Sequence, residues 1–334
     1  MHCPSLAELP PPPPGRNGWP WTEESPRTAG EFPRLTIVTP SYMQGQYLEQ
    51  TIRSVLLQNY PNLEYFIFDG GSTDCSREII EKYSPWLAGW RCEKDKGQAA
   101  VINEGWARGT GKVLAWINSD DWYHPGALAA VAPLCGGTQP ADWVGGPVDD
   151  CRPDGAFRKR HPAWPTPLPQ TLSFHEFGYH QPGMFWSRHL IDKVGRLDES
   201  MHLCFDLEFW ARSLAAGFTL RSVETPVACF RQHPTAKTSS RYEELVRESR
   251  ENFQRHSGSL SAVDRKQSAE WLREFTADFV LHIVYRHVRE ARRTTAASWL
   301  LRELRTLMKL RPRRLLCGAM WRVLVTGRPP AWIR

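Results

Sequence analysis

Strand and helix signals alternate along the chain from Leu35 to Leu134, and this alternation most restricts the possible fold. Apolar, β-branched runs predict strands, and apolar residues spaced three or four positions apart predict amphipathic helices between them. The predicted strands span residues 35–39, 64–69 and 112–117, and the predicted helices span 46–58, 74–83, 97–108 and 125–134. The pattern predicts an α/β fold with a mostly parallel sheet flanked by helices.

The chain is less regular on both sides of this region. Residues 140–180 are rich in Pro and Trp and less periodic. The pattern then predicts a strand at 184–186 and a helix at 206–216, followed by two short apolar runs at 219–223 and 227–230. The first 33 residues contain the run Pro10 to Pro14, which is typical of a disordered or polyproline leader. We therefore predict a leader over 1–33, one α/β domain over 34–240 and a helical, basic extension over 241–334.

The positive charge of the chain is concentrated at its C-terminal end. The net charge is +6, and nine Lys or Arg residues stand against the single acid Glu303 between Arg302 and Arg334. The rest of the chain is therefore slightly acidic, which argues against a nucleic-acid partner because such proteins carry a basic face around the site. Two interpretations of the tail remain open: peripheral contact with an anionic membrane, or a helix that packs on its own domain.

The chain shows no sign of secretion, of a membrane span or of a cysteine framework. The eight Cys are scattered without a C-x-x-C pair, as in reduced cytosolic proteins. The N-terminus lacks a basic leader followed by an apolar core, and the apolar stretch 315–327 is short and contains Arg322. We expect a cytoplasmic protein, with membrane association through the tail left open.

Carboxylates gather at the end of the strand predicted over 112–117. Asn118, Ser119, Asp120 and Asp121 follow this strand directly, at the edge of an α/β sheet where ligands bind. Neighbouring carboxylates are costly to hold together unless a cation lies between them. A divalent cation shared with a phosphate is the simplest explanation. The alternative is a polar turn before Pro125, since Asn, Ser and Asp also favour such turns.

The ends of the first two predicted strands carry further candidates. Pro40 is expected to end the first strand, so that Tyr42 opens a loop at the ligand-binding edge. Asp69 closes the second strand and is followed by Gly70, which permits close approach of the backbone. Neither G-x-G-x-x-G nor a P-loop is present, so hydride transfer and ATP hydrolysis lack their usual signals.

Several ordered motifs resemble one known family. The segments VTPSY, FDGGSTD, DKGQAAVINEGWARGTGKVLAWINSDDWYHPGAL, QPGMFWSRHL, FDLEFWAR and FRQHPTAKT, spread over residues 35–240, are similar to those of the family 2 glycosyltransferases. The resemblance implies the GT-A fold, which is Rossmann-like. It also implies inverting transfer of a sugar from a nucleotide diphosphate donor to an acceptor hydroxyl, assisted by Mg²⁺ or Mn²⁺.

The resemblance assigns roles to positions in this chain. Pro40 and Tyr42 would border the nucleotide, and Asp69 would bind the base. The remaining donor-side residues would be Asp95, Gln98, Asn103, Ser119 and Asp121. Asn118 and Asp120 fall on the D-x-D positions, where Asn118 departs from the commoner acid, and both would bind the metal with His233.

The helix predicted at 206–216 supplies the candidate base. Asp206 and Glu208 lie two positions apart and do not share one helical face, and the resemblance favours Asp206 as general base. The alternative is an acid that caps the helix. Arg212 is expected to anchor this helix. His180 and Gln181 resemble acceptor-side residues of the family, and the alternative is a hydrogen-bonded turn. Arg231 and Lys237, like His233, could approach the diphosphate or its metal, because fixed cations stabilise the charge of the leaving group.

Other functions fit the sequence less well. A nucleotidyltransferase needs a basic, Gly-rich phosphate loop, and VTPSYMQGQYL has no Lys or Arg. A serine hydrolase is disfavoured because G-x-S-x-G is absent. A non-catalytic nucleotide-sugar-binding protein stays open, because Asn118 replaces an acid. The expected donor is a UDP-hexose, and the expected acceptor is a glycan or its lipid-linked precursor.

Overall fold

The computed structural model describes residues 3–27, 32–233, 236–237 and 241–289, with side chains described up to residue 277 and at Phe279. The chain forms two compact units. The first contains Met1–Pro167 and Gly178–His233, and the second contains Leu168–Phe177 and Pro234–Arg334. The candidate site residues lie in the first unit, except Lys237.

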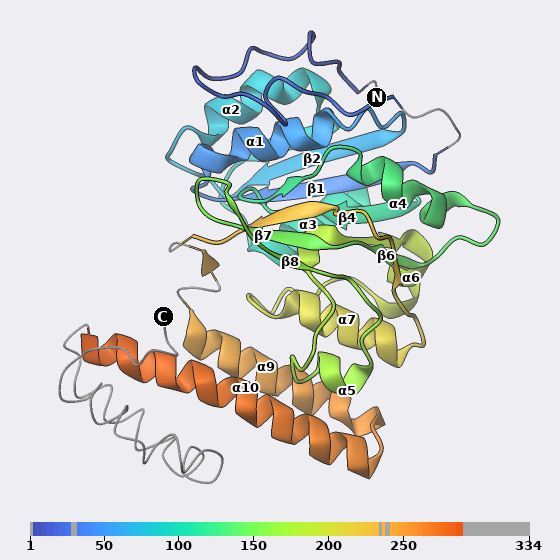
Figure 1. The fold of residues 1–334 in the computed structure, drawn as a ribbon, viewed down its shortest axis with the longest axis vertical. Helices are drawn as coiled ribbons and strands as arrows, with labels where there is room; N and C mark the ends of the chain where they lie inside the picture. Colours follow the sequence, from blue (N-terminus) through green and yellow to red (C-terminus); the bar gives the residue numbers. More distant parts are fainter. Residues whose placement is uncertain (1–2, 28–31, 234–235, 238–240, 290–334) are drawn as a thin grey trace. The chain divides into compact units, whose positions relative to one another are not determined.

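A seven-stranded, mostly parallel sheet forms the centre of the first unit (Figure 1), which confirms the predicted fold class. Its strand order is β10-β6-β9-β4-β1-β2-β3, and β9 is antiparallel to both of its neighbours. The strands are β1 (Leu35–Ser41), β2 (Leu63–Asp69), β3 (Gly89–Cys92), β4 (Val113–Trp116), β6 (Trp143–Gly145), β9 (Met184–Ser187) and β10 (Arg221–Ser222). Because β1, β2 and β4 are parallel and adjacent, the polar segments that follow them meet at one edge.

Both faces of the central strands are buried, as is usual for a parallel sheet between helices. Alternate residues such as Ile37 and Ala115 join a core with helices α1 (Gly45–Leu56), α2 (Ser76–Tyr83) and α4 (Ala127–Gly136). On the other face, Trp116 stacks on Trp186 at 4.8 Å between ring centroids. Helices α3 (Gln98–Arg108) and α7 (Phe205–Ala215) cover this aromatic layer, and α6 (Arg188–Val194) precedes α7 in the chain.

A second, four-stranded sheet has the order β5-β11-β7-β8. It consists of β5 (Trp122–Tyr123), β7 (Val148–Cys151), β8 (Phe157–His161) and β11 (Ala228–Arg231). A disulfide joins Cys151 of β7 to Cys229 of β11, with the Cα atoms 6.3 Å apart. The expectation that all cysteines are reduced is therefore wrong for this pair, because parallel pairing of β7 and β11 brings together residues 78 positions apart.

The leader is placed against the first unit, so the prediction of disorder is wrong for residues 3–27. Leu9 and Trp21 are buried, and the fully buried guanidinium of Arg53 on α1 donates to the carbonyls of Pro10, Pro20 and Trp21. A buried charged group needs such partners. The leader supplies them, which composition alone does not reveal.

The described residues of the second unit are mainly helical. It contains α5 (Leu168–Thr171), α9 (Tyr242–His256) and α10 (Ala262–Arg289). Phe174 stacks on Phe275 at 4.3 Å and His175 on Trp271 at 4.1 Å, so residues 168–177 pack with this unit instead of the domain predicted over 34–240. Among the described helices, none combines the length and the apolar character that a membrane crossing requires. The basic tail from Arg302 to Arg334 lies outside the described residues.

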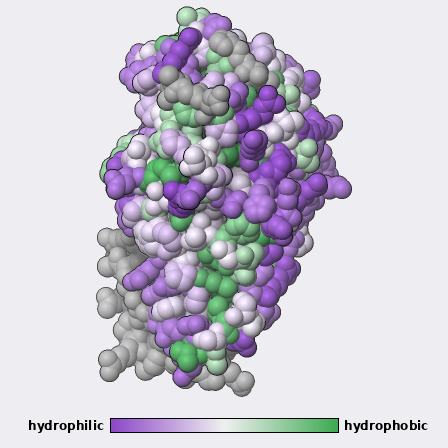
Figure 2. Space-filling view, turned by 90° about the vertical axis from the view of Figure 1, so that its right-hand side faces the viewer, coloured by the Kyte–Doolittle hydropathy of each residue, from purple (hydrophilic) through white to green (hydrophobic). Residues whose placement is uncertain are grey.

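Among the residues whose burial the structure describes, large hydrophobic side chains are rarely exposed. On the face drawn in Figure 2, hydrophilic residues dominate, and hydrophobic ones form a narrow band in its lower half. Two of the exposed large hydrophobic residues, Tyr42 and Met43, directly follow β1 at the edge where the polar segments meet. Exposed aromatic residues beside polar groups are typical of a binding surface.

Candidate functional site

The loops after β1 and β2 meet around a glycine. Gly70 follows β2, and a Cβ atom at this position would lie 3.1 Å from Asp95 Oδ2 and 3.3 Å from the ring of Tyr42. The fold therefore brings together two predicted donor-side residues, and Gly70 leaves the room for them. Tyr42 is 64% exposed, whereas Pro40 is buried inside β1, which continues to Ser41 instead of ending at the proline.

Asp69 is fully buried under the loop after β2. Its Oδ1 accepts hydrogen bonds from the backbone N–H groups of Gly71 (3.1 Å) and Ser72 (2.7 Å) and from Cys92 Sγ (3.1 Å), and its Oδ2 accepts from Ser72 Oγ (2.7 Å). These contacts shape the loop that carries Gly70. Its predicted role in binding the base stays a prediction.

Asn118 connects three parts of the site. Its Oδ1 accepts from Gln98 Nε2 at 2.6 Å, and its Nδ2 donates to Gln181 Oε1 at 3.1 Å and to Asp121 Oδ2 at 3.3 Å. Gln181 in turn donates to the carbonyl of Trp116 at 2.7 Å. The structure thus joins the start of α3, the end of β4 and the QPG turn (Gln181–Gly183) through one amide.

Asp120 and His233 are two possible metal ligands that lie together at this edge. Asp120 Oδ2 lies 2.9 Å from His233 Nε2, and His233 is buried with only 4% of its surface exposed. A carboxylate oxygen and an imidazole nitrogen that approach one point suit a cation such as Mn²⁺. Within the described part of the chain, no cluster of three His, Cys, Asp or Glu side chains could hold a metal. A phosphate-bearing ligand would therefore have to complete the coordination.

Buried charges surround this pair. Burial, together with the charge of Asp120, raises the pKa of Asp121 well above its usual range. Asp121 Oδ1 accepts from the backbone N–H of Arg231 at 2.9 Å. The Arg231 side chain, only 3% exposed, donates through Nε to the Asp120 carbonyl at 2.9 Å. Ser119 is also buried, and Thr51 of α1 donates to its carbonyl at 3.0 Å.

Asp206 lies in the first turn of α7, in the first unit, and is partly buried. Phe205 packs against Trp116 at 6.0 Å between ring centroids, which places the start of α7 beside the end of β4. Glu208 is buried and paired with Arg212 Nε at 2.8 and 2.9 Å. Arg212 also donates to the carbonyl of Arg196 at 2.7 Å, so Arg212 anchors the helix as the sequence predicted.

The acceptor-side candidates separate in the structure. His180 lies beside His161 at 4.3 Å between ring centroids, and burial, with His161 and Lys159 nearby, lowers the pKa of His180 to about 3. His180 is therefore neutral at physiological pH. Gln181 contacts Asn118, as described above. Lys237 belongs to the second unit and is exposed, so its predicted role remains a prediction.

Asn103 is not brought into this group. Its Nδ2 donates to the Leu197 carbonyl at 2.9 Å and to Glu199 Oε1 at 3.0 Å, and its Oδ1 accepts from Leu197 N at 3.0 Å. The residue fastens the loop after α6 to α3. The structure gives it a supporting position instead of one beside Asn118.

The sequence did not predict the residues that contact Arg231 near Asp120 and His233. Gln50 Oε1 accepts from Arg231 at 2.8 Å, and the Arg231 guanidinium carbon lies 4.4 Å from the centre of the Tyr47 ring and 4.5 Å from that of Trp122. Tyr47 and Gln50 look like ordinary positions of an amphipathic helix. No local signal distinguishes them, because their partner lies about 180 residues away.

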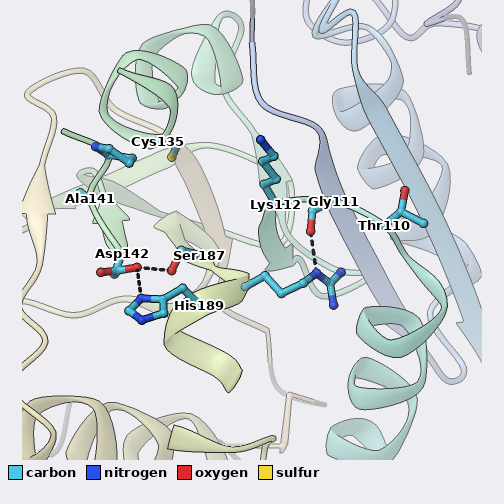
Figure 3. A pocket seen from close by; sticks show the side chains of 10 residues that line it. Thr110, Gly111, Lys112, Cys135, Ala141, Asp142, Ser187 and His189 are labelled. Carbon is cyan, nitrogen blue, oxygen red and sulfur yellow. Dashed lines mark hydrogen bonds and ion pairs between the residues drawn. The ribbon is translucent and has the colours of Figure 1, made fainter. Parts of the chain in front are cut away.

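A cavity of about 460 Å³ lies at the opposite edge of the sheet (Figure 3). Its lining includes Thr110, Gly111 and Lys112, which precede β4, whereas Asn118 follows this strand. Asp142 accepts from Ser187 and from His189 Nδ1, the latter at 3.0 Å. Asp142, Ser187 and His189 are thus paired with one another. The cavity is separate from the site at the carboxyl ends of the strands.

Sequence comparison identifies relatives over the same part of the chain. The family model described as "Glycosyl transferase family 2" matches residues 36–195. The uncharacterized glycosyltransferase Rv1514c of Mycobacterium tuberculosis is 30% identical over 183 residues, which are 54% of this chain and 69% of that protein. The uncharacterized glycosyltransferase alr2836 of Nostoc sp. is 31% identical over 115 residues, 34% of this chain and only 35% of that protein.

Solved structures share the fold. TarS of S. aureus (residues 1–349), in complex with UDP-GlcNAc, superposes with a TM-score of 0.54 at 16% identity, covering 72% of this chain and 71% of that one. The mannosyltransferase PcManGT of Pyrobaculum calidifontis, in complex with GDP-Man and Mn²⁺, also gives 0.54, at 18% identity, covering 96% of this chain and 88% of that one. At these identities the likeness concerns the fold alone.

Proposed function

Because the chain belongs to the family 2 glycosyltransferases, we propose that it transfers a sugar from a nucleotide diphosphate donor to an acceptor hydroxyl, with inversion at the anomeric carbon. One observation carries the proposal. The Asp120–His233 pair and the first turn of α7, which bears Asp206, both lie at the end of β4. Candidate ligands for a cation that would bind the diphosphate and a candidate base for the acceptor thus adjoin the same strand end.

The donor would lie across the ends of β1 and β2. Tyr42 is exposed, and both Tyr42 and the partly buried Asp95 lie close to Gly70. A flat base could therefore rest on the tyrosine ring, and a ribose hydroxyl could donate to the Asp95 carboxylate. Gln98 and Asn118 would line the side that receives the sugar. A UDP-hexose is the proposed donor. The structural neighbours named above are complexes with UDP-GlcNAc and with GDP-Man, which makes these two nucleotides the first to compare.

Asp120 and His233 fit a divalent cation, and we assign them to Mg²⁺ or Mn²⁺. A bound cation of this kind would neutralise charge on the leaving diphosphate. The neighbour PcManGT is a complex with Mn²⁺. Asn118 was also predicted as a ligand, but its Oδ1 accepts from Gln98 and its Nδ2 faces acceptors. In this arrangement Asn118 links the loop after β4 to Gln98 and Gln181, and Asp120 would supply the negative charge that a bound cation needs.

Asp206 would act as the general base. Its carboxylate would accept the proton of the acceptor hydroxyl while that oxygen bonds to the anomeric carbon and the bond from that carbon to the phosphate oxygen breaks. Glu208 cannot serve this role, because both of its oxygens accept from Arg212. The acceptor would be a glycan or its lipid-linked precursor, approached from the side of His180 and Gln181. Peripheral membrane contact through the basic tail and a cytoplasmic location remain predictions.

Calorimetric titration with UDP, GDP and dTDP, each with and without Mn²⁺, tests the proposal. We expect one nucleotide to bind in a Mn²⁺-dependent manner, and Asp120→Ala to abolish this dependence. Turnover of the matching nucleotide sugar then separates the transferase from a non-catalytic binding protein, which would bind without turnover. A folded protein that binds none of the three nucleotides would contradict both functions.

A further inference from the structure

Arg231 occupies an unusual position for a charged residue. Its side chain is 3% exposed and lies directly beneath the loop that carries Asp120 and Asp121. The sequence suggested that this arginine approaches the diphosphate. Burial removes the guanidinium from solvent, so another role has to explain the cost of placing a cation there.

The guanidinium joins segments that are distant in the sequence. Its Nε donates to the Asp120 carbonyl at 2.9 Å, one terminal nitrogen to the Pro153 carbonyl at 2.6 Å and the other to Gln50 Oε1 at 2.8 Å. The planar fork of an arginine suits such divergent acceptors, and a lysine ammonium does not reproduce the geometry. The side chain therefore ties the loop after β4 to α1 and to the turn between β7 and β8.

Aromatic rings and the backbone complete the arrangement. The guanidinium carbon lies 4.4 Å from the ring centre of Tyr47 and 4.5 Å from that of Trp122, within the range of cation–π attraction. The backbone N–H of Arg231 donates to Asp121 Oδ1 at 2.9 Å. His233 follows two residues later and meets Asp120 Oδ2 at 2.9 Å. One residue thus contacts both acids of the loop and fixes the strand that leads to His233.

We propose that Arg231 is the positioning residue that holds Asp120 and His233 at the separation a divalent cation requires. It does not contact the donor. The part of this inference that concerns a bound cation rests on the proposed function. The part that concerns how firmly Arg231 holds residues 118–123 in the metal-free protein does not. Loss of the fork would let the loop and β11 move independently, and the two ligands would no longer converge.

Arg53 provides a matched control. It is likewise a fully buried arginine on the same unit, and its fork donates to the carbonyls of Pro10, Pro20 and Trp21 and to Tyr83. Its partners belong to the leader and α2, not to the Asp120–His233 pair. Arg53→Lys should destabilise the fold in the same way as Arg231→Lys while leaving the contacts between Arg231 and the loop after β4 in place.

The experiment measures Mn²⁺ binding to the full chain by electron paramagnetic resonance in the presence of UDP, together with the Tm of each variant. We expect Arg231→Lys to weaken Mn²⁺ binding at least tenfold and Arg53→Lys to leave it unchanged at a comparable loss of Tm. Gln50→Met removes one acceptor of the fork with less risk to folding, and we expect a severalfold weakening there. Unchanged Mn²⁺ binding in Arg231→Lys, or equal weakening in both lysine variants, would overturn the proposal.

Hydrogen–deuterium exchange of the metal-free protein separates this inference from the proposed function. Arg231→Lys should increase exchange at residues 118–123, and Arg53→Lys should not. If the wild-type protein binds no Mn²⁺, the proposed metal fails, while the exchange data still decide the positioning role. Unchanged exchange in Arg231→Lys would then refute it.

Discussion

Asp206 and Glu208 show how neighbouring acids acquire different roles. Glu208 is buried and neutralised by Arg212, whereas Asp206 lies in the first turn of α7, partly exposed, where the helix dipole favours a carboxylate. A structural acid and a candidate base thus stand two positions apart. The difference arises from the helical periodicity, which turns them to different surroundings.

We expect Asp206→Asn to reduce sugar transfer by about 10²–10⁴-fold, the usual contribution of a general base. Nucleotide binding should be nearly unchanged, because the substitution keeps the shape of the side chain and Asp206 would act on the acceptor. Turnover and calorimetry on the same preparation make the comparison. A matching loss of nucleotide binding would assign Asp206 to the donor pocket instead of to the base.

His180 predicts a pH dependence of stability. Its pKa in the folded protein is lowered from 6.5 to about 3 by burial and by His161 and Lys159, so the folded state keeps it neutral where the unfolded chain binds a proton. The stabilisation is complete above pH 6.5 and is lost as the pH falls from 6.5 toward 3. Between pH 7 and pH 5 this amounts to roughly 2 kcal/mol.

Urea unfolding at pH 7 and pH 5 measures this effect in the wild type and in His180→Gln. The variant, which cannot take up a proton at this position, should lose about 2 kcal/mol less on acidification. The partly buried His124, whose pKa is lowered by burial, contributes with the same sign in both proteins. Identical pH dependence in the two proteins would mean that His180 does not titrate differently on unfolding.

At the scale of elements, the close contact between α3 and β1 sets the position of Gln98. A Cβ atom at Gly105 would lie 2.4 Å from Val38 Cγ2 and 3.2 Å from Phe68 Cε2. Only glycine lets the helix approach the sheet this closely. The contact brings the first residue of α3 within 2.6 Å of Asn118, so packing far from the site determines geometry in it.

Gly105→Ala should therefore destabilise the protein by about 1–3 kcal/mol, the usual cost of overpacking a core. The loss should be smaller in the background of Val38→Ala, which removes the clashing methyl groups, and a double-mutant cycle by urea unfolding measures the difference. Additive effects of the two substitutions would show that the clash is relieved by a movement of α3.

At the scale of the whole chain, the leader is part of the first unit. Leu9 and Trp21 are buried, and three leader carbonyls satisfy Arg53. A chain that starts at Phe32 should lose roughly 2–4 kcal/mol of stability, because it exposes this apolar surface and removes the partners of a buried charge. Thermal unfolding tests the expectation. An unchanged Tm would mean that the leader does not contribute to the stability of the first unit.

The sequence by itself determined the alternating elements. The strands β1, β2 and β4 and the helices between Leu35 and Leu134, but not the short strands β3 and β5, follow from local periodicity. A buried strand and an amphipathic helix each require their own spacing of apolar residues. It also located the polar strand ends at Asp69 and Asn118, because parallel strands bring these ends to one edge. It did not predict β7 and β8, since β8 is largely exposed and polar and therefore lacks the alternation of a half-buried strand.

Tertiary structure alone decided which of these residues meet. His233 reaches Asp120 and Cys229 reaches Cys151 only after β11 pairs with β5 and β7. Asn103, predicted to line the donor pocket, instead forms hydrogen bonds with Leu197. Residues of the leader contact Arg53, which lies outside the leader. The physical reason is common to these cases. Local periodicity reports how a segment buries its own apolar face, whereas long-range pairing of polar groups depends on partners that the segment does not contain.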